Sequence, residues 1–267
     1  MTGFAEEVRR HRLQGRESPI YWYASIGSTN DEAFRLEERE RIPEGTAVIA
    51  DAQTQGKGRS GRNWFSAPGA GLYLSVLLRP AKRGPSPFPL TLVAGVAVAT
   101  ALERQVGRPP RLKWPNDLRY EGLKVGGILT EARANPDRVT SVVVGIGINL
   151  SQLPEHFPPD LRQTATSVAV ATGRRPDRAE LAAKVLDELD AGYRLWLQRG
   201  LGPVAEAWRR MASTLGRKVR AVKNGIALEG LAEDLAEDGS LVIQTPAGPA
   251  RIQSGEVTEV ELTECSS

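Results

Sequence analysis

Three cations and three glycines share one short segment of this chain, Gly56–Arg62. The cations are Lys57, Arg59 and Arg62; no acidic residue interrupts them, and Trp64 follows. Glycine makes backbone N–H groups accessible, and Lys and Arg side chains pair with phosphate or carboxylate oxygens. The segment therefore predicts a loop that closes over an anionic ligand, with a solvated basic turn as the simpler alternative.

Two phosphate-binding motifs share the spacing of this loop, and both fail in detail. Gly56-x-Gly58-x-x-Gly61 matches the dinucleotide-binding fingerprint, which requires a helix to begin at the third glycine. Here that glycine leads into Arg62-Asn63-Trp64 and then a Pro-Gly turn. The Walker A motif requires Lys-Ser/Thr where Arg62-Asn63 stands. Neither a Rossmann site nor a P-loop is expected.

A second group of charged residues lies further along the chain. Proline does not fit the interior of a helix or a central strand, so Trp114-Pro115-Asn116 is expected to form a corner. Lys113 and Asp117 flank this corner. Lys124 then precedes Gly126-Gly127, and a strand without side chains at that point lets a ligand approach closely. These residues predict a site for an anion; an ion pair between Lys113 and Asp117 is the purely structural alternative.

Two further segments offer uncharged polar groups. Gly27–Asn30 joins a strand to a helix, and its Ser-Thr-Asn sequence is typical of a helix N-cap or of hydroxyls presented to a polar ligand. Ser28 with Asp31, or Thr29 with Glu32, has the spacing of a capping box. In the strand Ser141–Leu150, Gly145, Gly147 and Asn149 share one face, because side chains alternate along a strand. This face predicts the floor of a ligand site.

Hydrophobic patterns predict the elements that position these groups. The segment 85–107 is apolar almost all round, which predicts a helix buried against a sheet. From Gly216 onward, short strands and turns at Asn224-Gly225 and Asp238-Gly239 predict a small β-barrel. We therefore divide the chain into domains 1–213 and 214–267. Further strands are expected at 19–26, 46–50, 72–78, 124–131 and 141–150, and further helices at 1–17, after residue 28, after Asp177 and at 203–215.

Composition narrows the class of protein. The chain has 267 residues and a net charge of +3, which suits one or two globular domains and permits anionic ligands without requiring nucleic acid. The N-terminal segment has no apolar core of a secretory signal, and the apolar run Leu90–Leu102 is too short to span a bilayer. A single cysteine, Cys265, and two histidines, His11 and His156, argue against disulfides, a His-based triad and a zinc site. We expect a cytoplasmic protein that does not associate with membranes.

Five of these segments, in this order and spacing, resemble the biotin protein ligase family. The resemblance runs from about residue 20 into the C-terminal barrel. It implies an α+β fold, with a mixed-sheet catalytic domain of the biotin/lipoate ligase type, helices on one face, and a small SH3-like C-terminal β-barrel. The segments are Gly27–Asn30, Gln53–Trp64, Lys113–Asp117, Lys124–Glu131 and Gly145–Asn149.

The resemblance also implies an activity and its site residues. Members of the family use ATP and Mg²⁺ to convert biotin to biotinyl-5′-AMP, and then transfer biotin to a lysine of a biotin carboxyl carrier protein. The implied catalytic residues are Lys124, Lys113, Asp117 and Arg59. Those implied for biotin are Ser28, Thr29, Asn30, Gln53, Lys57, Gly58, Arg59, Lys124, Gly126 and Gly127. Those implied for the nucleotide are Arg59, Arg62, Trp64, Asn116, Lys124, Asn149 and Arg178, and no residue is singled out for the metal.

Two departures from the family pattern carry expectations of their own. Lys57 stands where the family usually has arginine; it keeps the charge but loses the bidentate fork, so we expect weaker retention of the adenylate. The segment before Ser28 is too short for the DNA-binding domain of the repressor members, so operator DNA is not an expected partner.

Other functions remain in competition with biotin ligation. A lipoate or octanoate ligase would share the fold, but its Arg-Arg-x-Ser-Gly-Gly-Gly loop is not found in this sequence. A non-catalytic biotin-binding protein would not need Lys113, Asp117 and Lys124. A nucleic-acid module should spread its cations among aromatic residues, whereas here they gather in one loop. The sequence leaves open which carrier is modified and whether the chain forms a homodimer.

Overall fold

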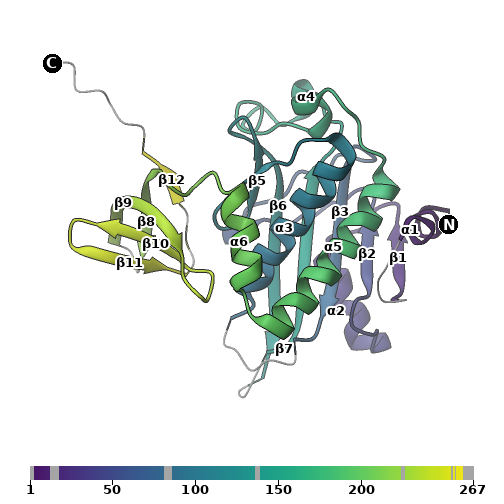
Figure 1. Ribbon diagram of the computed structural model, residues 1–267. Coiled ribbons are helices and arrows are strands. Elements are labelled where there is room, and N and C mark those ends of the chain that lie inside the picture. Colours follow the sequence, from purple (N-terminus) through teal and green to yellow (C-terminus); the bar gives the residue numbers. More distant parts are fainter. Residues whose placement is uncertain are drawn as a thin grey trace.

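The structure is a computed structural model that describes residues 3–12, 18–80, 86–135, 139–223, 226–253, 255 and 257–260. Its larger part is a mixed sheet with helices packed on it, and its smaller part is a separate antiparallel sheet near the C-terminus (Figure 1). This arrangement confirms the expected α+β fold. The predicted turn at Asn224-Gly225 and the single cysteine, Cys265, lie outside the described residues.

Seven strands form the large sheet, in the order β1-β2-β3-β7-β6-β5-β4. β1 pairs with β2 in parallel, and every other neighbouring pair is antiparallel. The apolar, β-branched stretch of β7 lies between β3 and β6 and is buried, as its composition predicts. The strands are β1 (Ile20–Tyr23), β2 (Ala47–Ala50), β3 (Gly71–Leu78), β4 (Arg111–Lys113), β5 (Asp117–Tyr120), β6 (Leu123–Ala134) and β7 (Val139–Asn149).

Three helices form a layer on one face of this sheet: α3 (Phe88–Val106), α5 (Arg178–Arg199) and α6 (Gly202–Met211) (Figure 1). The apolar pattern predicted α3 well, and the helix ends at Gly107, whose φ of 75° suits a glycine C-cap. The other helices are α1 (Gly3–His11), α2 (Thr29–Glu40) and the short α4 (Val168–Thr172), and single 3₁₀ turns occur at Arg59–Gly61 and Pro154–His156.

The expectation of helices on one face holds for this layer, and α2 departs from it. Ala33 and Leu36 of α2 pack with Val48, Leu77 and Val143 in a core cluster of their own, on the opposite face. The connection explains the position, because parallel neighbours such as β1 and β2 require a crossover element between them. α2 is that crossover, and its first turn brings the predicted Ser-Thr-Asn segment to the sheet.

The small C-terminal sheet has five antiparallel strands in the order β11-β10-β9-β8-β12. It confirms the small β domain expected from the turn-rich sequence, and Gly239 has the positive φ, 85°, that its turn requires. Arg209 of α6 binds Asp234 through its Nε at 2.5 Å, which fastens this sheet to the helical layer. The strands are β8 (Lys218–Lys223), β9 (Ile226–Leu235), β10 (Leu241–Thr245), β11 (Gly248–Ile252) and β12 (Val257–Glu259).

Candidate active site

A cavity of about 400 Å³ opens over one end of the central strands, under the glycine-rich loop. All the residues predicted for the site line it, with the exceptions of Gly126 and Arg178. Six cations face it, and Asp117 is the one carboxylate among its described lining residues. The cations are Lys57, Arg59, Arg62, Lys113, Arg119 and Lys124.

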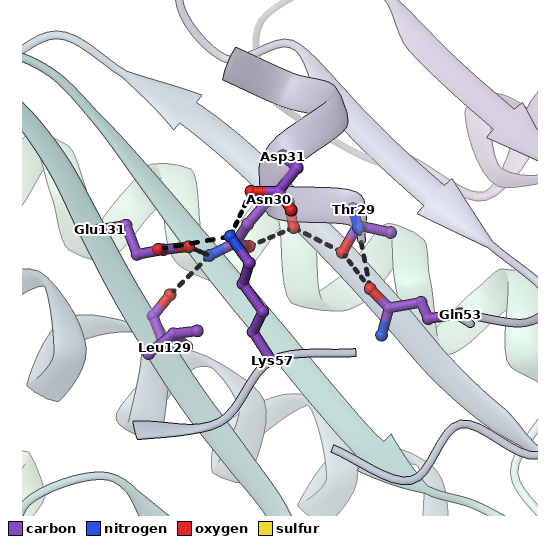
Figure 2. Close-up of polar contacts among 8 residues, drawn as sticks. Thr29, Asn30, Asp31, Gln53, Lys57, Leu129 and Glu131 are labelled. Atoms are coloured by element: carbon purple, nitrogen blue, oxygen red, sulfur yellow. Dashed lines mark hydrogen bonds and ion pairs between the residues drawn. The ribbon is translucent and has the colours of Figure 1, made fainter. Parts of the chain in front are cut away.

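At one end of the cavity, which we call the amide end, Thr29, Asn30 and Gln53 line the cavity (Figure 2). The amide end also includes Ser75 and Glu131, which do not line the cavity but contact Asn30. Gln53 Oε1 accepts from the backbone N–H of Thr29 at 2.8 Å and from its hydroxyl at 3.0 Å. Asn30 Nδ2 donates to Glu131 Oε2 at 2.7 Å. Thr29 and Asn30 are buried in the first turn of α2, so these side chains hold each other in fixed orientations.

Ser75 belongs to the amide end and was missed in the sequence. Its hydroxyl is completely buried on β3 and lies 2.6 Å from Asn30 Oδ1 and 2.7 Å from Thr29 Oγ1. The available signal was a single hydroxyl in the otherwise apolar strand Gly71–Leu78. A buried polar side chain needs partners, and its position next to Tyr73 and Leu74 gave no indication of where they would be.

The capping interpretation of the Ser28 segment is wrong in its details. Ser28 is the N-cap residue of α2, but within the described chain its side chain accepts no hydrogen bond from the helix N–H groups. Asp31, which would complete a capping box, binds Lys57 instead. Ser28 is buried and lines the cavity, which agrees with the alternative that this segment presents polar groups to a ligand.

The glycine face of β7 lines the cavity, and protein side chains lie on it, so its role as the floor of a ligand site stays a prediction. A Cβ at Gly145 would collide with Asn30 Oδ1, and a Cβ at Gly147 would lie 2.5 Å from the Trp64 ring. The glycines therefore admit Asn30 and Trp64, which in turn face the cavity. Trp64 Nε1 is buried without an acceptor among the described residues.

The glycine-rich loop folds into a compact turn over the cavity. Gly58 donates its N–H to the carbonyl of Arg62 at 2.6 Å, and Ser60 has a φ of 56°. The ammonium of Lys57 binds Asp31 and lies 3.9 Å from Glu131 Oε1 (Figure 2). The hydrogen bond with Asp31, and the nearby negative charge of Glu131, raise the pKa of Lys57 although partial burial alone would lower it. Lys57 thus ties the loop to the amide end.

Arg59 joins the loop to two other parts of the chain. Its Nη1 donates to Asn116 Oδ1 at 3.0 Å, and its Nη2 donates to the carbonyl of Gly255 at 3.3 Å. Gly255 and Val257 belong to the C-terminal domain and line the cavity. The small domain therefore forms part of the wall of the site, which the sequence did not indicate.

The other end of the cavity, which we call the charged end, consists of Lys113, Asp117, Arg119 and Lys124. Asp117 and Lys113 are directly opposite each other on β5 and β4. Asp117 Oδ1 binds Lys124 Nζ at 2.6 Å, and its Oδ2 lies 3.7 Å from Arg119 Nη2. The structure therefore pairs Asp117 with Lys124, a pairing that was not predicted from the sequence.

The corner before the charged end is held by the C-terminal part of the chain. The backbone N–H of Trp114 donates to Thr214 Oγ1 at 2.9 Å, and the indole N–H donates to the carbonyl of Gly239 at 3.1 Å. Trp114 also packs against Phe88 of α3, with ring centroids 5.7 Å apart. The rigid corner predicted around Pro115 is thus fixed by contacts that are distant in sequence.

Three predicted residues have other surroundings than expected. Arg178 does not line the cavity; it binds Asp51 and lies over the Phe4 ring. Gly126 lies against Leu118 and the carbonyl of Gly147, where a Cβ would meet that oxygen at 3.0 Å, so it serves strand packing. Asn149 lines the cavity, but its amide donates to the carbonyl of Thr166 and holds that loop. The ligand roles of these residues remain predictions.

Comparisons with known proteins agree with this geometry. Residues 22–149 match the Biotin/lipoate A/B protein ligase family, and residues 214–258 match the Biotin protein ligase C terminal domain. The chain is 37% identical to the bifunctional ligase/repressor BirA of Bacillus subtilis over 238 residues, which cover 89% of this chain and 73% of that one. It is 33% identical to the biotin–[acetyl-CoA-carboxylase] ligase of Mycobacterium tuberculosis over 243 residues, which cover 89% and 87%.

A solved structure shows the same fold. The biotin protein ligase from Aquifex aeolicus in complex with biotin and ATP is similar with a TM-score of 0.78 and 34% sequence identity, over 90% of this chain and 97% of that one. Fold, cavity and sequence lead to one assignment. The chain belongs to the biotin protein ligase family.

Proposed function

We propose that this chain activates biotin with ATP to give biotinyl-5′-AMP and then transfers the biotinyl group to a lysine of a biotin carboxyl carrier protein. The observation that carries the proposal is the division of one cavity into the amide end and the charged end. Biotin has an uncharged ureido group at one end and a carboxylate at the other, and ATP adds phosphates next to that carboxylate. A ligand of this shape complements both ends of the cavity.

Hydrogen-bond counting at the amide end favours a ligand with N–H donors. Three oxygen–oxygen contacts link Ser75 to Asn30, Ser75 to Thr29 and Thr29 to Gln53. The orientation of both amides is fixed, since Asn30 Nδ2 donates to Glu131 and Gln53 Oε1 accepts a backbone N–H. The two hydroxyls supply only two protons for these three contacts, so one contact lacks a proton. The ureido N–H groups of biotin can donate to the oxygen that is left without a donor, whereas the dithiolane ring of lipoate has no N–H group.

At the charged end, the first reaction joins two anions. A biotin carboxylate oxygen attacks the α-phosphorus of ATP, a P–O bond forms, and pyrophosphate leaves with its electron pair. We assign Lys124 and Arg59 to the negative charge that develops at the phosphate, because fixed cations in a site shielded from water stabilise such charge strongly. Lys113 assists from β4, and Trp64 supports the adenine.

Mg²⁺ would arrive with the phosphates of ATP. Within the described residues no group of three or more His, Cys, Asp or Glu side chains is placed to hold a metal ion. This donor set fits a metal bound mainly by phosphate and water, as is usual for Mg²⁺ with nucleotides. Bound there, the metal would neutralise phosphate charge.

The second reaction requires a neutral amine from the carrier. The free pKa of a lysine is about 10.4, so a base must take its proton before it attacks. We assign this role to Asp117, the one carboxylate among the described lining residues. The amine nitrogen then attacks the acyl carbon, an amide bond forms, and AMP leaves. The relatives named as acetyl-CoA-carboxylase ligases support the carrier domain of that enzyme as the acceptor, and we place the reaction in the cytoplasm.

The test is exchange of labelled pyrophosphate into ATP, measured with biotin and, in parallel, with lipoate. Biotin-dependent exchange without lipoate-dependent exchange is expected. Exchange with lipoate alone would move the substrate to that acid while keeping the fold. If neither acid gives exchange although biotin binds tightly, the protein is a binding protein, and the assignments of Arg59 and Lys124 are wrong.

A further inference from the structure

Arg119 is a charged residue at the site that belongs to none of the five family-like segments. It follows Asp117 by two residues on β5, so the two side chains share a face of the strand, while Leu118 and Tyr120 between and after them enter the core. Arg119 lines the cavity and is opposite Lys124 in the β5–β6 register.

The guanidinium of Arg119 makes a hydrogen bond through one nitrogen and lacks acceptors, among the described residues, at the other two. Its Nη1 donates to the carbonyl of Gly122 at 2.7 Å. Its Nε is buried and has no hydrogen-bond partner among the described residues, and its Nη2 lies 3.7 Å from Asp117 Oδ2, beyond hydrogen-bond distance. Nε and Nη2 form the side edge of the guanidinium, which binds a carboxylate with two parallel hydrogen bonds. The edge closest to Asp117 is therefore the one that lacks acceptors.

Lys124 and Asp117 have conflicting tasks in the reaction proposed above. In this structure Asp117 holds the ammonium of Lys124 at 2.6 Å. Under the proposed function, the same ammonium serves the biotin carboxylate and the α-phosphate, and Asp117 must then be free to accept a proton. When the anionic ligand draws Lys124 away, Asp117 loses its closest partner in a cavity with few acceptors and many cations.

We infer that Arg119 is a positioning residue, which receives the carboxylate of Asp117 on its Nε–Nη2 edge when the anionic ligand takes Lys124. The inference rests on the proposed function and adds to it a partner exchange, in which Asp117 moves from Lys124 to Arg119. The exchange releases the ammonium for the phosphate. It also keeps Asp117 ionised and oriented for the amine of the carrier, because an adjacent cation favours the charged form of a carboxylate.

A double-mutant cycle tests this inference. The variants are Arg119→Met, which removes the charge at similar length, Asp117→Asn and the double variant, and the measured rate is single-turnover transfer from preformed biotinyl-AMP to a carrier domain. Arg119→Met is expected to slow transfer about tenfold in the native background and less than about twofold in the Asp117→Asn background, because residues that act through each other are not additive. Biotin-dependent pyrophosphate exchange is expected to fall less than transfer does, because the anionic ligand itself draws Lys124 away from Asp117 in the first reaction. Arg108→Met is the matched control, since Arg108 contacts Glu121 and the Tyr120 ring instead.

The pH profile of transfer gives a readout that a merely structural role would not move. The charged groups facing Asp117 are Lys113 from β4, Lys124 from β6 and Arg119 from its own strand, with Arg59 bound to the neighbouring Asn116. Loss of the Arg119 charge is expected to move the acid-side limb of transfer to higher pH. Arg119→Lys restores the limb but only part of the rate, since an ammonium lacks the two-donor edge.

The outcomes separate this inference from the proposed function. If the native protein shows no biotin-dependent exchange, the proposed function fails. The inference is overturned if the native protein shows both reactions but Arg119→Met slows transfer by the same factor in the native and the Asp117→Asn backgrounds. It is also overturned if Arg119→Met leaves the acid-side limb of the pH profile unchanged. Thermal unfolding of each variant is recorded alongside, and Arg119→Lys provides the same comparison should Arg119→Met prove unstable.

Discussion

The amide end and the charged end of the cavity are constructed in different ways. At the amide end, Asn30, Thr29 and Ser75 are at most 4% exposed and lie in hydrogen-bond contact with one another. At the charged end, the side chains of Asp117 and Lys124 are 20% and 32% exposed. Arg119 Nη2 lies 3.7 Å from Asp117 Oδ2, too far for a hydrogen bond. The first arrangement suits recognition of a neutral group of fixed shape, and the second suits charges that change partners during a reaction. Preorganised contacts give specificity, whereas incompletely paired cations remain available to developing charge.

The largest effect is expected from Lys124→Met, which breaks the charged end. Biotin-dependent pyrophosphate exchange should fall about a thousandfold, because one donor to developing charge contributes about 10²–10³ in rate. Biotin affinity, measured by calorimetry without ATP, should change far less if the two ends are independent. Lys184→Met is the control, since that lysine binds Glu180 on α5. A variant that keeps native exchange would remove Lys124 from the chemistry.

Asp117→Asn separates the two reactions at the charged end. We expect transfer from preformed biotinyl-AMP to the carrier to fall about a hundredfold, the low end of the effect of a general base. Pyrophosphate exchange should fall much less, since the first reaction requires no proton transfer. Asp160→Asn, on an exposed loop, serves as the control. Full transfer by Asp117→Asn would contradict the assignment of this residue as the base.

Ser75→Ala sharpens the comparison from the amide end. The substitution leaves Asn30 Oδ1 without its hydroxyl donor in a buried position, and such a loss costs about 1–3 kcal/mol. Biotin should bind about tenfold more weakly by calorimetry, with a matching loss of stability in denaturant unfolding. Ser141→Ala is the matched control: Ser141 is also buried in the sheet, but its hydroxyl donates to Glu37, so stability should fall and biotin affinity should not. Equal biotin affinities in both variants would show that Ser75 has no part in the site.

The smallest effect, on the dissociation of biotinyl-AMP, is expected from Asp31→Asn, which removes the ion pair between Lys57 of the loop and Asp31 of α2. The Lys57 and Asp31 side chains are 41% and 52% exposed, and exposed ion pairs contribute about 0–1 kcal/mol, so biotinyl-AMP should dissociate at most about fivefold faster. The pKa of Lys57 is raised, so the contribution of the pair is complete below the ordinary value of 10.5 and is lost only as the pH rises through the raised pKa. The ratio of the two dissociation rates, followed by stopped flow, should therefore be the same at pH 7 and pH 9. A ratio that collapses between these values would exclude the ammonium of Lys57 as the partner.

Local patterns in the sequence predicted most of the elements and most of the cavity lining. Glycine spacing identified the loop around Lys57 and Arg59, and the Pro115 corner identified Lys113 and Asp117, because these signals lie within a few residues of each other. The helix at Phe88–Val106 followed from apolar residues alone. Such features depend on backbone preferences that act over short distances in the chain.

What the sequence could not predict depends on contacts between distant segments. Arg178 was expected at the nucleotide but binds Asp51, 127 positions away. Asp31 has the spacing of a capping residue, and its preference for Lys57 becomes visible only when the loop folds over α2. Arg119 could have been noticed as a cation two positions after Asp117 in the sequence. The lack of acceptors at its Nε–Nη2 edge, within the described part of the chain, could not have been predicted. Pairings of this kind are set by sheet order and register, which local patterns do not specify.

The contribution of Gly255 and Val257 to the cavity wall has a consequence for biosynthesis. The site begins with Ser28 and is not complete until a segment more than two hundred positions later has folded against Arg59. During translation, the loop and the charged end emerge from the ribosome long before this wall. A partly synthesised chain that lacks this wall therefore lacks the enclosed site in which the proposed acyl-adenylate would be made and retained.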